Sequence, residues 1–118
     1  MRKYLALALL AGTAQANTLY EVKAHVTEQG KEMTFPTFEL QDDGRVASTE
    51  VGGCTYIATL NHYVQNTLTL SATMACKDEE SRTMPAFILN KNSDGASYEL
   101  EDDGKVVWKY SVEVDAVD

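Results

Sequence analysis

Apolar and polar residues alternate along much of the chain with a period of two. Three stretches show this pattern clearly, and they are Tyr20–Val26, Leu68–Cys76 and Val106–Val114. Alternation directs one set of side chains to a core and the other to water, so it predicts half-buried antiparallel strands. Thr, Val and Tyr, which favour strands, are abundant, and no stretch places apolar residues at helical spacing.

Clusters of Gly, Asp and Asn divide the alternating segments at short intervals. The strongest signals are the Asp-Gly pairs at 43–44, 94–95 and 103–104, because glycine accepts the positive φ of two-residue hairpin turns. The segments between turns predict eight strands, at 18–28, 32–41, 44–51, 54–61, 64–76, 82–91, 96–101 and 105–114. Short strands at this spacing predict an all-β fold, either an antiparallel β-sandwich or a small closed barrel.

The chain also repeats itself. Thr34–Gln41 matches Thr83–Asn90 at an offset of 49 residues, and each copy contains one of the two prolines. A competing echo relates Phe38–Val46 to Tyr98–Val106 at an offset of 60. The first echo predicts an internal repeat with two four-stranded halves, and the second predicts similar hairpins that reuse one turn chemistry. We favour the first because of the prolines, which we expect on edge strands or at bulges.

The first 16 residues have the three parts of a cleavable secretory signal peptide. Arg2 and Lys3 form a positive n-region, and Tyr4–Ala11 is an apolar h-region. Ala14–Ala16 is an A-x-A cleavage site, so we expect a mature chain that begins at Asn17. The apolar run has eight residues, whereas a membrane span needs about 20. The compact n-region and the Ala-rich h-region are typical of bacterial signal peptides. We therefore expect an exported protein that is periplasmic or extracellular and is not inserted in a membrane after cleavage.

The mature chain, residues 17–118, is long enough for a single domain with one core. Cleavage of the signal peptide removes Arg2 and Lys3, so the mature chain has eight basic and 18 acidic residues and a net charge of −10. This charge disfavours binding to nucleic acid or anionic lipid, since both need neutralising cations. It favours a soluble surface and, for a binding protein, a basic partner.

Cys54 and Cys76 are the two cysteines of the chain. An even count in an exported chain predicts a disulfide, here closing a loop of about 23 residues and stabilising the fold by about 3 kcal/mol. No CxxC is present and no histidine stands near either cysteine at ligand spacing. The sequence thus favours a structural bridge over a metal site or a reactive thiol.

Residues suited to catalysis are sparse. His25 and His62 are the two histidines; His25 falls on the polar phase of its strand and His62 lies in a predicted turn. No G-x-S-x-G elbow and no phosphate-binding loop is present. We therefore expect neither enzyme activity nor a cofactor.

Calcium is the metal that the acidic turns could bind, because it prefers several carboxylate oxygens. The candidates are Asp42 and Asp43 in one turn and Asp102 and Asp103 in another. No D-x-D-x-D-G loop is present, so a site would have to be assembled from separate turns. The alternative is that these aspartates bond to the backbone of their own turns, and we favour it.

Most aromatic residues fall on the apolar phase of a strand and are expected in the core. Trp108 and Tyr110 should share a face with Val106. Tyr63 is the aromatic residue most expected to be exposed, because it lies in a turn. Exposed aromatics often anchor partners, so Tyr63 and the neighbouring His62 are candidate partner-binding residues.

Three functions are compatible with these features. The first is a non-enzymatic module that offers a sheet edge or a loop to a protein partner or supports an assembly. The second is a secreted inhibitor of a hydrolase such as a lysozyme or a protease, with Asn61–Gln65 or Lys77–Arg82 as its rigid loop and its acidic charge matching a basic enzyme. The third is a weak calcium-binding protein.

Overall fold

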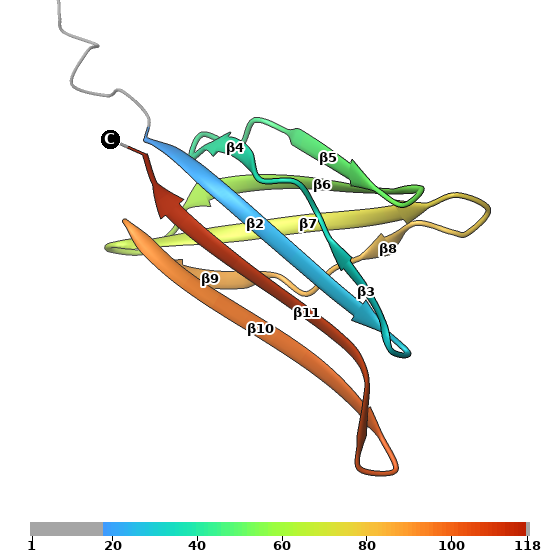
Figure 1. The fold of residues 1–118 in the computed structure, drawn as a ribbon. Helices are drawn as coiled ribbons and strands as arrows, with labels where there is room; N and C mark the ends of the chain where they lie inside the picture. The colour runs from blue at the N-terminus through green and yellow to red at the C-terminus, as the bar shows by residue number, and fades with distance from the viewer. Residues whose placement is uncertain (1–17, 118) are drawn as a thin grey trace, which may run out of the picture.

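The computed structural model describes residues 18–117, and the predicted signal peptide lies outside them. Ten strands form two antiparallel sheets, with the strands of one sheet running obliquely across those of the other (Figure 1). The strands are β2 (Leu19–Glu28), β3 (Lys31–Thr34), β4 (Phe38–Gln41), β5 (Ala47–Val51), β6 (Cys54–His62), β7 (Thr67–Cys76), β8 (Arg82–Thr83), β9 (Phe87–Asn90), β10 (Ser93–Asp102) and β11 (Lys105–Ala116). The all-β prediction is confirmed.

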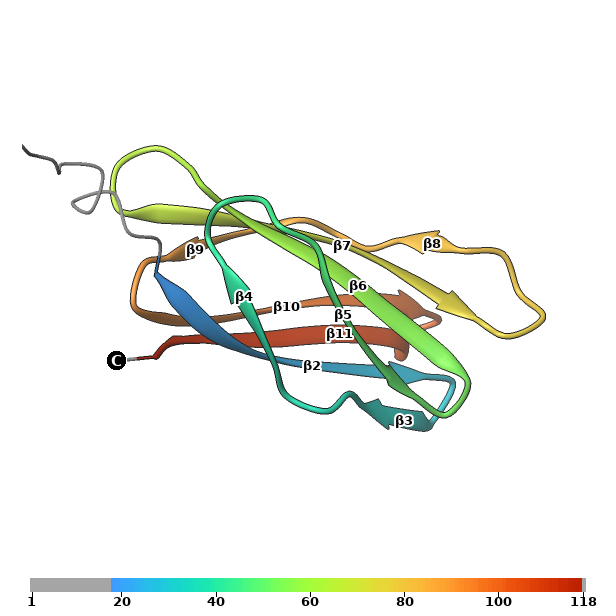
Figure 2. The ribbon, with the colours of Figure 1, turned by 90° about the horizontal axis from the view of Figure 1, so that it is seen from above.

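The two sheets remain separate layers, as Figure 2 shows from above. One sheet has the order β10-β11-β2-β3, with β4 also paired to β2. The other has the order β5-β6-β7-β8, with β9 also paired to β7. Of the two predicted architectures the fold is therefore the sandwich and not the closed barrel. No helix long and apolar enough to cross a membrane occurs within residues 18–117.

Eight predicted segments become ten strands because proline interrupts two of them. Segment 32–41 is divided into β3 and β4 around Pro36, and segment 82–91 into β8 and β9 around Pro85. A proline has no N–H to donate to a ladder, so pairing stops there and resumes beyond it. Each proline lies in the gap of an interrupted edge strand, which agrees with the predicted edge position, and the other strand boundaries agree within three residues.

The two halves of the chain have the same topology. In the first half, β2 and β3/β4 belong to one sheet, and β5 and β6 belong to the other. The second half repeats this order with the sheets exchanged: β7 and β8/β9 lie in the sheet of β6, and β10 and β11 lie in the sheet of β2. The hydrogen bonds repeat as well, with donors 49 positions apart and acceptors 48 positions apart: Phe35 N donates to Ala24 O at 3.0 Å, and Met84 N donates to Ala72 O at 2.9 Å. The structure thus follows the 49-residue echo. The 60-residue echo relates a connection between sheets to a hairpin.

Positive φ angles mark the hairpin turns. The pair Asp103-Gly104 has φ values of 51° and 77°, as a type I′ turn between β10 and β11 requires. Gly52-Gly53 has the same signature between β5 and β6, at 57° and 81°. The other two Asp-Gly pairs do not form hairpins, because Asp43-Gly44 lies in the crossover from β4 to β5 and Asp94-Gly95 lies inside β10. At those positions the hairpin expectation is wrong.

The centre of the core is a cluster of aromatic rings between the sheets. Tyr56 of β6 and Tyr110 of β11 are fully buried, their ring centroids are 6.0 Å apart, and their hydroxyl groups form a hydrogen bond. Phe35 lies 5.4 Å from the Tyr56 ring, and Phe87 lies 5.2 Å from the Tyr110 ring. Burial raises the pKa of Tyr56 to about 12, because the phenolate would lose its hydration.

Cys54 and Cys76 form the predicted disulfide, which links β6 and β7 at paired positions. The bridge fastens one end of this central strand pair. A disulfide is consistent with the oxidising compartment that the N-terminal sequence predicts.

Candidate functional site: an open seam in the sandwich

The edges of the two sheets meet along two seams, and the first seam is closed. It lies between β5 and the interrupted strand β3/β4. The Thr49 hydroxyl on β5 donates a hydrogen bond to the Pro36 carbonyl at 3.0 Å, and Thr49 is buried by this contact. A small side chain that reaches the opposite backbone thus joins the two layers on this side.

The second seam, between β10 and β8/β9, is formed by the equivalent residues of the other half. Tyr98 is the counterpart of Thr49, and Pro85 is the counterpart of Pro36, each at the offset of 49. No hydrogen bond is recorded between Tyr98 and Pro85, and the Tyr98 side chain stays 42% exposed. A hollow of about 310 Å³ opens here, lined by Glu28, Gln29, Arg82, Thr83, Pro85, Tyr98, Leu100, Val107 and Trp108.

The opposite end of the second seam is tied. The Asp94 carboxylate accepts hydrogen bonds from the backbone N–H groups of Asn90 and Gly95, each at 2.8 Å. These donors stabilise the charged form and hold the pKa of Asp94 below its usual value. The seam is therefore closed where β9 turns into β10 and open towards the β10–β11 turn.

The opening results from the length of the β10–β11 hairpin. The paired residues Tyr98 and Tyr110 are 12 positions apart, whereas their counterparts Thr49 and Tyr56 are seven apart. Pairing of β11 with β2 starts at Trp108, so the added part of the hairpin extends past its neighbour (Figure 1). Its inner face is only partly covered there, since the Leu100 side chain stays about half-exposed.

Two sequence expectations fail at this hairpin. Tyr98 belongs to the aromatic residues of which most are expected in the core, and Val106 is expected to share the buried face of Trp108 and Tyr110, but both side chains are exposed. Val106 is 47% exposed, because it lies beyond the end of β2 and next to a register shift between β10 and β11. The alternation of residues predicts which face a side chain occupies, but not whether a second layer reaches it.

Trp108 forms the inner wall of the hollow. The guanidinium of Arg82 lies 5.3 Å from the centre of the indole ring, a cation–π contact, and its Nη2 lies 3.7 Å from Oε2 of Glu28. The indole N–H of Trp108 is buried and has no hydrogen-bond partner in the described structure. Both contacts of the Arg82 side chain are partly exposed to solvent, so we expect them to hold it only weakly over the indole.

β10 forms one rim of the hollow and is the longest edge strand of the described sandwich. Its ten residues pair with β11 on one side and with no described strand on the other. Tyr98 and Leu100 point to the inner face, since they are paired with the buried Tyr110 and Trp108. Leu100 is nevertheless 47% exposed. The edge thus combines free backbone hydrogen-bonding groups with uncovered apolar side chains.

The predicted partner-binding residues lie elsewhere, at the β6–β7 loop. Tyr63 is 52% exposed, as expected, and the adjacent Val64 is also exposed. The loop is braced from within: Tyr63 N donates to Thr67 O at 2.9 Å, and Thr67 N donates to Gln65 O at 2.7 Å. The structure therefore places Tyr63 as an exposed side chain on a hydrogen-bonded loop.

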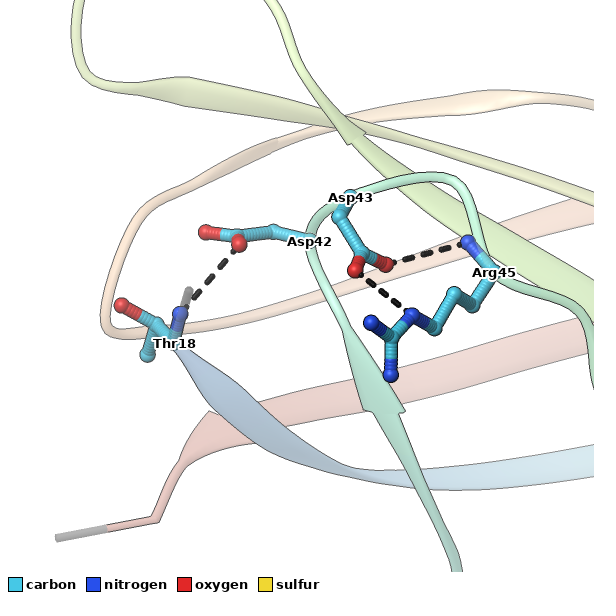
Figure 3. A network of polar contacts seen from close by, with 4 residues as sticks. All are labelled: Thr18, Asp42, Asp43 and Arg45. Atoms are coloured by element: carbon cyan, nitrogen blue, oxygen red, sulfur yellow. Dashed lines mark hydrogen bonds and ion pairs between the residues drawn. The ribbon is translucent and has the colours of Figure 1, made fainter. Parts of the chain in front are cut away.

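His62 and Asp42 are brought together, although the sequence assigns them to different turns. Nε2 of His62 lies 3.0 Å from Oδ2 of Asp42, whose carboxylate is buried, but this contact is not directed as a hydrogen bond. Oδ1 of Asp42 accepts the Thr18 N–H at 3.2 Å (Figure 3). The pKa of Tyr20 is raised, mainly by burial and secondly by the negative charge of Asp42. Asp42 thus fastens the start of β2 to the β4–β5 crossover.

Asp43 bonds within its own turn, as favoured for the acidic turns. Its Oδ1 accepts the Arg45 N–H at 3.1 Å, and its Oδ2 lies 2.9 Å from Nε of Arg45 (Figure 3).

The second acidic turn is far from the first. Asp102 and Asp103 lie at the tip of the β10–β11 hairpin, at the other end of the sheet from Asp42. Within residues 18–117 no three His, Cys, Asp or Glu side chains are grouped as a metal site would need. The two acidic turns are therefore not brought together into one site.

Neither a protein-family model, a curated protein sequence nor a solved structure matches this chain.

Proposed function

We propose that this chain is an exported, non-enzymatic β-sandwich that binds a protein partner by adding an extended segment of that partner to the free edge of β10. The observation that carries the proposal is the open seam: a ten-residue edge strand whose inward side chains, Tyr98 and Leu100, lie uncovered beside a hollow. Strand addition supplies main-chain hydrogen bonds for affinity and side-chain pockets for specificity.

The contrast with the other three edges supports this assignment. β3/β4 and β8/β9 are interrupted by Pro36 and Pro85, and β5 has only five residues and is tied to Pro36 through Thr49. Exposed edges promote uncontrolled pairing, and proteins protect them with prolines, short strands and covering contacts. β10 is the longest edge and contains no proline, and beyond the contact of Asp94 with Asn90 no such tie holds it to β8/β9 in the described structure.

Export is the second part of the proposal. It is supported by the n-region, h-region and cleavage motif within residues 1–16 and by the Cys54–Cys76 bridge, which persists in oxidising compartments. N-terminal sequencing of the protein recovered from the periplasm or medium should begin at Asn17. A chain that keeps Arg2 and Lys3 would contradict export by this signal.

Cross-linking from the edge tests the partner-binding role. A photoreactive amino acid is placed at Ser97 on β10 or, as the control, at Ser48 on β5, which is its exposed counterpart in the other half. We expect a discrete cross-linked species from position 97 that is lost when Leu100 is changed to Ser. Equal cross-linking from positions 97 and 48, or a product from position 97 that survives Leu100→Ser, would contradict binding at this edge.

A secreted hydrolase inhibitor is the second candidate, and the braced β6–β7 loop favours it. Rigid loops with exposed apolar tips suit insertion into an enzyme cleft, because little conformational entropy is lost on binding. Inhibition of a basic lysozyme or protease that Tyr63→Ala/Val64→Ala abolishes, while Tyr98→Ser leaves it intact, would support this candidate. No inhibition across a panel of such enzymes would exclude it.

A further inference from the structure

We infer that the segment accepted by β10 alternates basic and apolar residues, with the apolar side chains facing the hollow and the basic side chains facing the outer surface. The inference rests on the proposed strand addition at β10. It follows from the side chains that β10 presents on its two faces.

The inner face selects apolar side chains. A strand paired with β10 places alternate residues beside Tyr98 and Leu100, above the wall formed by Trp108. The hollow of about 310 Å³ lies at the lower end of the range for ligand pockets, so it has room for one or two large side chains. Apolar groups there would complete the core layer that the second sheet leaves open.

The outer face selects basic side chains. β10 contains Asp94, Glu99, Glu101 and Asp102 and no Lys or Arg. Strand alternation places Glu99 and Glu101 on the face opposite to Leu100. Glu99 is 3.6 Å from Nζ of Lys109, whereas Glu101 and Asp102 have no ion pair within the described structure. Carboxylates without a counterion along an edge favour Lys or Arg on the added strand, since opposite charges across strands stabilise pairing.

The same charges argue against a second copy of this chain as the occupant. Among charged residues, two β10 edges paired with each other would bring acidic side chains together and no basic ones, because the strand has no Lys or Arg. Like charges on adjacent strands are destabilising. The acidic edge therefore discourages self-association while it remains open to a basic partner.

Three capped ten-residue peptides test the inference: alternating Lys-Val, Gln-Val and Glu-Val. Binding is measured by titration calorimetry and by the amide signals of β10 in NMR spectra. We expect the Lys-Val peptide to bind about tenfold more tightly than the Gln-Val peptide and to shift β10 amides, and the Glu-Val peptide not to bind. Raised salt should weaken the Lys-Val complex.

Matched variants separate edge charge from overall charge. Glu99→Gln/Glu101→Gln should remove most of the preference for Lys-Val, whereas Glu50→Gln on β5, the counterpart of Glu99, should leave it unchanged.

N-methylated peptides distinguish strand pairing from simple charge attraction, because the N–H groups of neighbouring residues point to opposite sides of a strand. Only one of the two sets, the Lys positions or the Val positions, has its N–H groups directed at β10. Methylating that set should abolish binding, and methylating the other set should not.

The outcomes separate the inference from the proposed function. Equal or tighter binding of Gln-Val or Glu-Val at β10 would overturn the basic pattern while leaving strand addition intact. An equal effect of both methylation patterns would overturn strand pairing. If no peptide binds, the inference is wrong, and cross-linking from Ser97 then decides the proposed function independently.

Discussion

Tyr56 and Tyr110 occupy equivalent positions in the two halves of the chain, and their hydroxyl groups are hydrogen-bonded to each other in the centre of the core. Within the described residues, each tyrosine is the only recorded hydrogen-bond partner of the other's hydroxyl. A buried hydroxyl without a partner keeps its full desolvation cost, so these two residues should behave as a unit.

A double-mutant cycle measures this coupling. Tyr56→Phe and Tyr110→Phe should each lower the free energy of unfolding by about 1–3 kcal/mol, because each leaves one buried hydroxyl unpaired. The double variant should lose less than the sum of the two, since no unpaired hydroxyl remains. Urea unfolding monitored by circular dichroism gives the three values. Strict additivity would mean that the two hydroxyl groups do not depend on each other.

Alkaline pH should destabilise the fold through the same pair. Burial raises the pKa of Tyr56 from the ordinary tyrosine value of 10.0 to about 12, so the folded protein holds its proton more tightly than the unfolded chain. This contribution is complete below about pH 10 and is lost as the pH rises from about 10 to about 12, with a magnitude of about 2–3 kcal/mol. Unfolding free energies measured across this range should fall steeply. The Tyr56→Phe/Tyr110→Phe variant should show a shallower decline.

The disulfide should contribute mainly by restricting the unfolded chain. Cys54→Ala/Cys76→Ala should lower the free energy of unfolding by about 3 kcal/mol, the value expected for a loop of about 23 residues. The same loss should follow reduction of the native protein, measured by urea unfolding with and without reductant. A loss under about 1 kcal/mol in both experiments would show that the bridge restricts little.

The buried Asp42 carboxylate should matter for stability more than the exposed acidic turn. Asp42→Ala removes the acceptor of the Thr18 N–H and the contact with His62, and it should cost about 1–3 kcal/mol in thermal or chemical unfolding. Asp102→Ala at the hairpin tip should change stability by less than about 0.5 kcal/mol. Similar losses for the two variants would contradict the structural role of Asp42.

The strands are predictable from the sequence because their signals are local. Alternation identifies the core face of β2, β7 and most of β11, and Pro36 and Pro85 locate the edge strands of both sheets. The disulfide follows from the cysteine count and the expected compartment. These features need no knowledge of distant contacts.

The open seam is not predictable in the same way. Whether Tyr98 is buried depends on the reach of the other sheet, and the contact between His62 and Asp42 joins the end of β6 to a residue 20 positions earlier in the chain. One signal is present: the 49-residue echo aligns Thr49 with Tyr98, so a small residue stands in one half and a large one in the other. Comparison of the two halves can therefore point to the seam.

Variants of the seam should separate binding from stability. Leu100→Ser should leave the free energy of unfolding within about 0.5 kcal/mol of the parent chain, because the side chain is already half-exposed. It should abolish partner binding. Ile88→Ser is the control, because it also replaces an exposed apolar side chain, one that is 61% exposed on β9. It should leave both the free energy of unfolding and partner binding unchanged. Loss of binding in both variants would argue for general surface hydrophobicity.

Hydrogen exchange at the β10 edge tests strand addition most directly. In the free protein alternate amides of Ala96–Asp102, beyond the end that Asp94 ties, should exchange rapidly, because one side of the strand is unpaired there, while those bonded to β11 exchange slowly. In the complex with the cross-linked partner, the rapid set should become protected and the amides of β5 should not change. Rapid exchange that persists at β10 in the bound state would contradict strand addition at this edge.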